Sequence, residues 1–381
     1  MKIEIQTEIL KTGLKDVSAA IGNKSAIPIL ECVVLTPKGE NLTLEASDGD
    51  VWITRTIQMI TPAEEDTFPI SIKAKEFTSA ISALPEQPLI MEAEEGIVKV
   101  IYSNGSFSMP YNDAEDFPQP KKGDEEKLAI IREKASSLEY AINSALTCVG
   151  KDSLRIVLNG CCIDIQDDGV RVVASDGHKL SKVLLPQSHA TGGGKAICLP
   201  TKATMLLRNM ISKNTSEEMV QIEIDSSLLY ASYTDGTITA RLTDGNYPKY
   251  DGIIPEECTC TCEVEKEAAM MAIRRVSQFA DQNSQMIRMV LCVDSSMLRI
   301  EGVDKDFSRS AKEEMACVYN GQEDMTIGIK STALLDVLSA ISTDRVVFNI
   351  ISPDKAIVIK PVIDTDFTLT QAMLVMPMMI V

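Results

Sequence analysis

The stretch Val173-Ala174-Ser175-Asp176-Gly177-His178-Lys179-Leu180 joins a run of β-forming residues to a Ser-Asp-Gly turn and a second short strand-like run. The same Ala-Ser-Asp-Gly core occurs at residues 46–49, so that Asp48 and Asp176 are 128 residues apart. A turn repeated at this spacing predicts a repeated domain. The chain of 381 residues is long enough for three such domains.

Six amphipathic helical patterns recur along the chain. Each has apolar residues three and four apart, which is typical of a helix with one buried face. Each is entered from a short strand, through residue 5, 72, 131, 199, 264 or 329, and strand-like runs such as 97–101 separate the helices. We therefore predict six units of one helix and about four strands. The predicted buried faces include Ile9, Leu10, Leu14 and Val17 in the first helix and Met205, Leu206, Met210 and Ile211 in the fourth.

Alternate units match better than adjacent ones, which predicts that the units pair into three domains. Asp116-Phe117-Pro118 closes the second unit, Asn246-Tyr247-Pro248 the fourth and Val375-Met376-Pro377 the sixth. The joins between domains are polar and contain proline. The expected fold class is α+β, with a pseudo-six-fold chain made of three tandem domains at 1–121, 127–254 and 257–381.

Composition excludes several classes of protein. No apolar run approaches the roughly 20 residues that a membrane helix needs, so we expect a cytoplasmic protein with no membrane partner. The ten cysteines are scattered, which is typical of reduced thiols. Cys258, Cys260 and Cys262 alternate along a predicted strand and should share one face. Zinc sites favour other spacings, and both histidines lie far away in the sequence, so we expect neither a metal nor a cofactor.

The net charge of −18 argues against a basic surface over the whole protein. The charge is uneven, however, because the six helical segments together carry +5 and the remainder −23. The fourth helix has Lys202, Arg208 and Lys213 and no acidic residue. For any single helix an ordinary solvated face is an alternative explanation. The contrast between helices and remainder favours a helical surface that contacts phosphates without reading bases.

Helix dimensions restrict how such a surface could surround DNA. Six helices in a circle leave a bore of only about 9 Å, whereas twelve leave about 28 Å. Only the wider bore admits a duplex. A ring would therefore require two chains, closed head to tail between first and third domains.

The chain resembles the bacterial sliding clamp, the β subunit of DNA polymerase III, from end to end. The motifs that carry the resemblance are Ile27-Pro28-Ile29-Leu30, Phe117-Pro118, Leu158-Asn159-Gly160, ASDGHKL at 174–180, Asp244-Gly245-Asn246-Tyr247-Pro248 and Val375-Met376-Pro377-Met378. The resemblance implies a non-catalytic processivity factor of a DNA polymerase. It also implies three tandem clamp domains and a ring-shaped homodimer that encircles duplex DNA independently of sequence.

The resemblance also implies roles for individual residues. It implies a partner groove that takes short apolar and glutamine-containing peptides from the replicative polymerase, the clamp loader and repair proteins. Leucine, proline and methionine suit such a groove because they form an adaptable apolar surface. Gly252 stands beside it where the family often has arginine. The implied groove residues are Leu158, Ser175, Gly177, His178, Lys179, Leu180, Pro248, Ile253, Met376, Pro377 and Met378. The implied dimer contacts are Phe107, Met109, Arg275, Gln278 and Phe279, and the DNA-facing residues are Lys24, Lys151 and Lys202, with Arg208 and Lys213 on the basic fourth helix.

Two other functions are worth weighing. Ser175, Asp176 and His178 have the residue types of a hydrolase site, but one turn is too short for the geometry of a triad, and no Gly-x-Ser-x-Gly elbow surrounds them. We expect Asp48 and Asp176 to form turns by accepting hydrogen bonds from nearby backbone amides. We therefore expect no catalytic residue. The second alternative is a repeat scaffold that binds only proteins.

Overall fold

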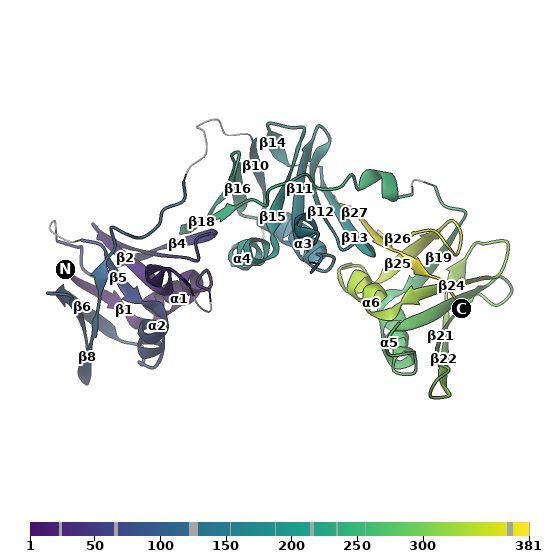
Figure 1. The fold of residues 1–381 in the computed structure, drawn as a ribbon, viewed down its shortest axis with the longest axis horizontal. Coiled ribbons are helices and arrows are strands. Elements are labelled where there is room, and N and C mark those ends of the chain that lie inside the picture. The colour runs from purple at the N-terminus through teal and green to yellow at the C-terminus, as the bar shows by residue number, and fades with distance from the viewer. Residues whose placement is uncertain are drawn as a thin grey trace. The chain divides into compact units, whose positions relative to one another are not determined.

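The computed structural model describes residues 1–22, 25–64, 68–121, 129–152, 154–186, 188–213, 217–233, 235–255, 257–363 and 369–380. In these residues one strand, one helix and three further strands follow each other six times (Figure 1). The predicted six-fold repeat and the α+β class are confirmed. The helices are α1 (Thr7–Ser18), α2 (Ala74–Ser82), α3 (Ala135–Leu146), α4 (Thr201–Ile211), α5 (Lys266–Ser277) and α6 (Ser331–Ser339).

The strand that enters each helix contains the residue predicted for it. Positions 5, 72, 131, 199, 264 and 329 all lie in these strands. The local alternation of apolar residues was therefore sufficient to find them. The entering strands are β1 (Lys2–Gln6), β5 (Ile70–Lys73), β10 (Ala129–Lys134), β15 (Lys195–Pro200), β19 (Cys260–Glu265) and β24 (Met325–Lys330).

The chain divides into two compact units, of which the first holds residues 1–135 and 205–242. One of its sheets has the order β1-β6-β7-β8, with β6 (Pro88–Glu94), β7 (Ile97–Tyr102) and β8 (Gly105–Pro110). In the other, β10-β16-β17-β18-β4-β3-β2-β5-β9, Ile238 of β18 stands opposite Ile53 of β4. The remaining strands are β2 (Cys32–Lys38), β3 (Asn41–Ser47), β4 (Val51–Gln58), β9 (Asn112–Asp113), β16 (Met219–Ile224), β17 (Leu228–Tyr233) and β18 (Gly236–Arg241).

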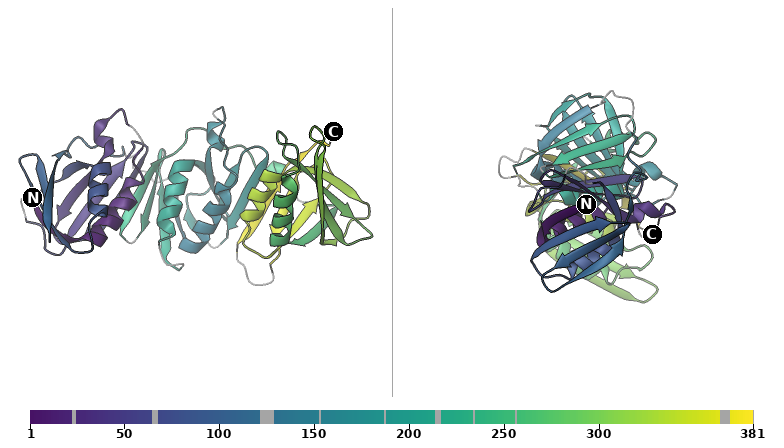
Figure 2. Two further views of the ribbon diagram at one scale, coloured as in Figure 1. Left: turned by 90° about the horizontal axis from the view of Figure 1, so that it is seen from below. Right: turned by 90° about the vertical axis from the view of Figure 1, so that its left-hand side faces the viewer.

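The helices α1 and α2 lie side by side in this unit (Figures 1 and 2). Leu10, Leu14 and Val17 of α1 are buried as predicted. The prediction for Ile9 was wrong, because its side chain is 40% exposed. Gly13 belongs to the buried face, where an added Cβ would lie 2.6 Å from Leu44 Cδ1 on β3. The helix therefore packs closely on the sheet here, and a larger residue would require the Leu44 side chain to move.

The second unit holds residues 136–204 and 243–381. Its larger sheet has the order β15-β11-β12-β13-β27-β26-β25-β19-β23, and its smaller one β22-β21-β20-β24-β28. Antiparallel pairing of β13 with β27 continues the larger sheet from the middle of the chain to its C-terminal part. The strands are β11 (Gly160–Gln166), β12 (Gly169–Ser175), β13 (Lys179–Leu185), β14 (His189–Thr191), β20 (Met286–Cys292), β21 (Met297–Asp304), β22 (Arg309–Ala316), β23 (Val318–Tyr319), β25 (Arg345–Ile350), β26 (Ile357–Pro361), β27 (Thr370–Val375) and β28 (Pro377–Met378).

Sheets that run through β18–β4 and β13–β27 cross the domain boundaries predicted from the sequence. Strand pairing of this kind joins neighbouring domains through backbone hydrogen bonds rather than through side chains alone. The boundaries at 1–121, 127–254 and 257–381 stay a prediction.

A buried hydrogen-bond network holds α3, α6 and β27 together. Gln371 of β27 is 1% exposed. Its Nε2 donates to Ser144 Oγ at 2.8 Å and to the Ala340 carbonyl at 3.0 Å, and the Tyr140 hydroxyl donates to its Oε1 at 2.5 Å. Ser144 Oγ also lies 2.7 Å from Ser181 Oγ of β13. Because these polar groups are buried, each hydrogen bond prevents an unpaired donor or acceptor.

Helix α4 buries Leu206, Met210 and Ile211, as predicted. The prediction for Met205 was wrong, because its side chain is 46% exposed. At 3.6 residues per turn, Met205 lies one turn from Lys202, on the solvent side of the helix. The helical spacing of apolar residues identified the buried face of α4 correctly, except that it included the exposed Met205.

Candidate partner-binding site

The Ser-Asp-Gly turn between β12 and β13 is held by its own side chains. The carboxylate of Asp176 accepts hydrogen bonds from the backbone N–H groups of His178 at 2.8 Å and Lys179 at 2.9 Å. Ser175 Oγ donates to the Lys179 carbonyl at 2.9 Å and accepts from Gly177 N–H at 3.1 Å. Gly177 has a φ of 91°, a conformation that favours glycine. The predicted turn-forming role of Asp176 is confirmed.

The turn between β3 and β4 has the same construction. Asp48 accepts from Asp50 N–H at 3.0 Å and Val51 N–H at 2.9 Å, and Ser47 Oγ accepts from Gly49 N–H at 2.9 Å. The third member of the series was missed by the sequence analysis. Asp304 lies another 128 residues after Asp176, and it accepts from Phe307 N–H at 3.1 Å. No glycine follows Asp304, which explains why the Ser-Asp-Gly signature did not reveal this turn.

The same interactions are incompatible with a hydrolase triad. Ser175 Oγ is engaged with the backbone of its own turn, and the Asp176 carboxylate accepts backbone amides rather than a histidine N–H. A triad needs the serine hydroxyl to donate to a histidine whose other nitrogen donates to the carboxylate. The three residues therefore shape a turn.

The turn lies beside the C-terminal strand, although the two are far apart in the sequence. Lys179 stands opposite Val375 and Leu180 opposite Leu374 in the β13–β27 pair. The backbone N–H of Met376 then donates to the His178 carbonyl at 2.8 Å. The structure thus brings the turn residues 175–180 beside Met376, whereas Pro377 and Met378 pair with β24.

Two further segments reach the same place. A Cβ added to Gly177 would lie 3.2 Å from Arg155 Nη1, just before the short 3₁₀-helix η2 (Ile156–Leu158). A Cβ added to Gly245 would lie 3.0 Å from Val157 Cγ1, which places the 244–248 loop beside that helix. Leu154 and Ile156 are 90% and 65% exposed, and the sequence analysis had not selected them. No residue type or spacing distinguished them before the fold was available.

The predicted groove residues differ in accessibility. Ile253 and Met376 are 52% and 40% exposed, and Gly177, His178 and Pro248 are also exposed. Pro377 and Met378 are half-buried. Leu180, in contrast, has no exposed surface, since it packs with Tyr250, Leu374 and other residues of one core cluster. Leu158, Ser175 and Lys179 are buried as well, and the Lys179 ammonium pairs with Asp336 of α6. In this structure these four residues lie below the surface that the others form.

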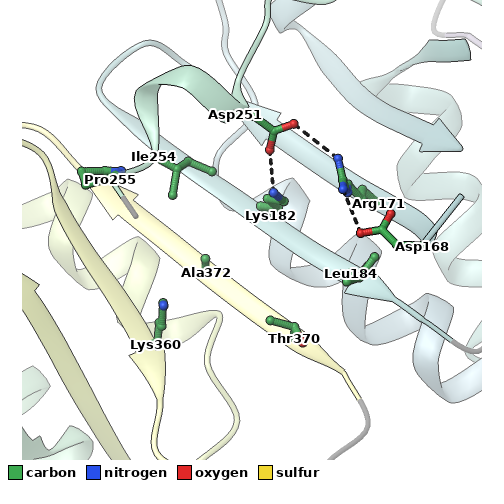
Figure 3. A pocket seen from close by; sticks show the side chains of 10 residues that line it. All are labelled: Asp168, Arg171, Lys182, Leu184, Asp251, Ile254, Pro255, Lys360, Thr370 and Ala372. Atoms are coloured by element: carbon green, nitrogen blue, oxygen red, sulfur yellow. Dashed lines mark hydrogen bonds and ion pairs between the residues drawn. The ribbon is translucent and has the colours of Figure 1, made fainter. Parts of the chain in front are cut away.

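A cavity of about 450 Å³, here called the seam cavity, opens along the β13–β27 pair (Figure 3). Asp251 bridges two cations there, at 2.6 Å from Lys182 and 3.3 Å from Arg171. Asp168 lies 2.9 Å from Arg171, whose hydrogen bond lowers the pKa of that carboxyl. The lining residues are Asp168, Arg171, Lys182, Leu184, Asp251, Ile254, Pro255, Lys360, Thr370 and Ala372.

One tyrosine, Tyr250, belongs to the apolar cluster that also contains Leu180 and Leu374. Its hydroxyl donates to Asp164. Burial raises the pKa of Tyr250, and hydrogen bonding to the Asp164 carboxylate adds to the effect. Lys182 Nζ lies 5.6 Å from the centre of the same ring, within cation–π range. The Tyr250 hydroxyl therefore stays protonated, and its ring attracts the Lys182 ammonium.

The predicted DNA-facing residues differ in their surroundings. Lys24 lies outside the described residues. Lys151 and Lys202 are exposed, and Arg208 donates to Asn209 Oδ1 on its own helix. Lys213 forms an ion pair with Asp16 of α1. Part of the positive charge counted on the fourth helix is thus matched by an acidic residue from another helix.

The predicted dimer residues lie on or beside two outer strands. Phe107 and Met109 are half-buried in β8, which has β7 as its only neighbour among the described strands. Arg275 of α5 forms two hydrogen bonds, of 2.8 and 2.6 Å, to Glu313 of β22. Gln278 caps the end of α5, and Phe279 is 43% exposed just after it. Strand β22 likewise has a single described neighbour, β21.

Most of the cysteines are buried, and Cys258 is exposed. Cys260 and Cys262 are buried on one face of β19 as predicted, but Cys258 precedes the strand and is exposed. The described cysteines are free thiols. Within the described ranges, no three His, Cys, Asp or Glu side chains are grouped so that they could hold a metal ion. Nor is any described helix long and apolar enough to cross a membrane.

The repeated β-α-β-β-β units, the sheets shared between them and an apolar site made of turn and C-terminal residues define a clamp-type fold. Family models cover nearly the whole chain. Residues 1–121 match the N-terminal domain of the DNA polymerase III beta subunit, residues 134–249 its central domain and residues 251–379 its C-terminal domain. The chain belongs to the DNA polymerase III beta subunit family, and its function is that of a sliding clamp, a non-catalytic processivity subunit of a DNA polymerase.

Individual relatives agree with this assignment. The chain is 26% identical to the beta sliding clamp of Synechococcus elongatus over 367 residues, which cover 95% of this chain and 96% of that protein. It is also 26% identical to the beta sliding clamp of Pseudomonas aeruginosa, over 99% of this chain and all of that protein. Crystal structures of the clamps from P. aeruginosa and Bacillus subtilis match the fold over both full chains, with TM-scores of 0.90 and 0.88 at 24% and 19% identity.

Proposed function

We propose that two copies of this chain close head to tail into a ring around duplex DNA, and that the ring holds partners through the groove beside the Ser-Asp-Gly turn. The replicative polymerase, the clamp loader and repair proteins would be the partners, each binding through a short peptide. This assembly would operate in the cytoplasm. The observation that carries the proposal is the pair of outer strands, β8 in the first unit and β22 in the second.

An outer strand exposes backbone N–H and C=O groups that can pair with a strand of another chain. Pairing β8 of one copy with β22 of the next uses each outer strand once and makes a heterologous contact. Two such contacts close a dimer. Phe107 and Met109 on one side, and Phe279 just after α5 on the other, supply apolar side chains for this contact.

The proposed DNA contacts are electrostatic. Lys202 and Arg208 lie on the solvent side of α4, where they could attract phosphates without reading bases. Lys151 is exposed in the loop after α3. Sequence-independent contacts of this type suit a ring that moves along DNA.

The proposed groove is supported by the connection between the turn and the C-terminal strand. The hydrogen bond from Met376 N–H to the His178 carbonyl fixes the exposed Met376 beside the turn. Ile253 faces solvent from the 3₁₀-helix η3 (Asp251–Ile253). Exposed methionine and isoleucine beside a rigid turn provide an adaptable apolar contact for a peptide.

The size of the protein in solution tests the ring. At micromolar concentration, sedimentation should give twice the chain mass of 41.6 kDa. Phe107→Asp with Met109→Asp should give a folded monomer, because charges would be buried in the contact. Ser106→Asp is the matched control, since alternate residues of β8 point to opposite faces. A monomeric parent protein, or a dimer unaffected by the double change, would refute the head-to-tail contact.

A further inference from the structure

We propose that the seam cavity is an acidic-residue site that extends the partner groove, and that it binds a carboxylate next to the apolar anchor of a partner peptide. The inference rests on the proposed function, because it needs a peptide in the groove. It adds a chemical preference, for aspartate or glutamate in the flank of the peptide, that the apolar groove residues do not provide.

The seam cavity continues the groove along two paired strands. Leu180 stands opposite Leu374, Lys182 opposite Ala372 and Leu184 opposite Thr370. Alternate residues of a strand share a face, so Lys182 and Leu184 follow Leu180 on the same face at intervals of about 7 Å. A peptide anchored near the buried Leu180–Leu374 pair would therefore have its flanking residues within reach of the cavity.

The charges in the cavity favour a single carboxylate. Arg171, Lys182 and Lys360 line it together with only two carboxylates, Asp168 and Asp251. Within the residues that the structure describes, Lys360 has no ion pair or hydrogen bond, and its side chain is exposed at the cavity (Figure 3). A polyanion such as nucleic acid would be repelled by both acidic side chains and by the overall charge of −18. A single carboxylate, in contrast, would need only one unpaired cation, which Lys360 supplies.

Asp251 shows that a carboxylate fits between these cations. It contacts Lys182 and Arg171 while its own side chain stays 56% exposed. The same short helix, η3, also carries Ile253 of the proposed groove. A peptide that packs on Ile253 would thus place its flank beside Asp251, where Lys360 and Lys182 could accept a second carboxylate. Ile254, Leu184 and Ala372 supply apolar surface around the site.

Four fluorescein-labelled peptides test the preference. Each has a Gln-Leu-Leu-Phe core, extended at one end or the other by Gly-Glu-Glu or Gly-Gln-Gln. Their Kd values are measured by fluorescence anisotropy at about 50 mM and about 500 mM salt. The increase in salt shortens the electrostatic screening length several-fold. At one end the Glu peptide should bind roughly two- to fivefold more tightly than its Gln partner, as expected for a partly exposed ion pair, and the difference should vanish at high salt.

Two variants decide where the carboxylate binds. Lys360→Gln should remove the preference for Glu without changing the Kd of the Gln peptides. Lys38→Gln removes the same charge from an exposed position on β2 and should leave the preference intact. Equal Kd values for Glu and Gln peptides at both ends, or a preference that survives Lys360→Gln, would overturn the inference while the groove itself still stands. Failure of all four peptides to bind would instead refute the groove, which is the part of the proposed function on which this inference rests.

Discussion

Replacing Asp176 with alanine should loosen the turn and weaken peptide binding, whereas the same change at its twin, Asp48, should only loosen a turn. Each carboxylate accepts two backbone hydrogen bonds of nearly equal length, 2.8 and 2.9 Å at Asp176 and 3.0 and 2.9 Å at Asp48. A typical hydrogen bond contributes about 0.5–1.5 kcal/mol, so two in a partly exposed turn should contribute about 1–2 kcal/mol. That loss corresponds to roughly 5- to 30-fold more frequent local opening.

Hydrogen–deuterium exchange followed by mass spectrometry measures the opening at each turn separately. Fragments covering 175–182 should exchange faster in Asp176→Ala, and fragments covering 47–54 in Asp48→Ala, each without change in the other region. Local opening is the appropriate quantity here, because a chain of several domains need not unfold in one step.

Peptide binding distinguishes the two variants. In Asp176→Ala the Kd of a Gln-Leu-Leu-Phe peptide should rise about fivefold, because roughly 1 kcal/mol must then be spent on ordering the turn that bonds to Met376. Asp48→Ala should bind as the parent protein does. An unchanged Kd in Asp176→Ala despite faster exchange at 175–182, or equal weakening in both variants, would refute the assignment of this turn to the groove.

Three further predictions concern the joint, the acid response and DNA. Gln371→Leu should lower the free energy of unfolding by about 2–3 kcal/mol, because Ser144, Tyr140 and the Ala340 carbonyl would lose buried partners. Gln119→Leu at an exposed site should have little effect, and equal melting temperatures for the two variants would contradict the prediction. The hydrogen bond from Arg309, with that from Phe307 N–H, lowers the pKa of Asp304. The stabilisation by this carboxylate is therefore present above the unfolded pKa of about 3.9 and is lost as the pH falls through the folded pKa. Between about pH 5 and 2.5 the melting temperature of Asp304→Asn should fall less steeply than that of the parent protein, and parallel curves would be evidence against the pairing. Lys202→Ala and Arg208→Ala should each reduce the slope of log K for DNA against log salt by about 1, and Lys38→Gln should not; an unaltered slope in the first two would remove α4 from the DNA contact.

The repeat could be predicted from the sequence because its signals are local. Strand alternation and helical spacing act over a few residues, and the positions 5, 72, 131, 199, 264 and 329 all lie in the strands that enter helices. The same period misassigned Ile9 and Met205, which lie at the edges of the buried faces and are exposed. Whether a residue at the edge of a helix face is buried depends on the neighbouring element, and the helical period of the sequence contains no information about that element.

The site depends on contacts that sequence spacing does not encode. The resemblance places Leu180 in the groove, yet Tyr250 and Leu374, distant in the sequence, cover it. The seam cavity likewise combines side chains from β12, β13, β26, β27 and the 251–255 segment. Asp304 shows the opposite limit, since the geometry of the turn persists where its Ser-Asp-Gly signature does not.

Retention on circular DNA tests the central claim most directly. The protein is placed on a nicked circular duplex by the clamp loader of the same organism with ATP, separated from free protein by gel filtration and then treated with a restriction enzyme that linearises the DNA. A closed ring should remain on the circle and be lost from the linear product. Equal retention on both forms, or no retention on the circle with an active loader, would contradict the account.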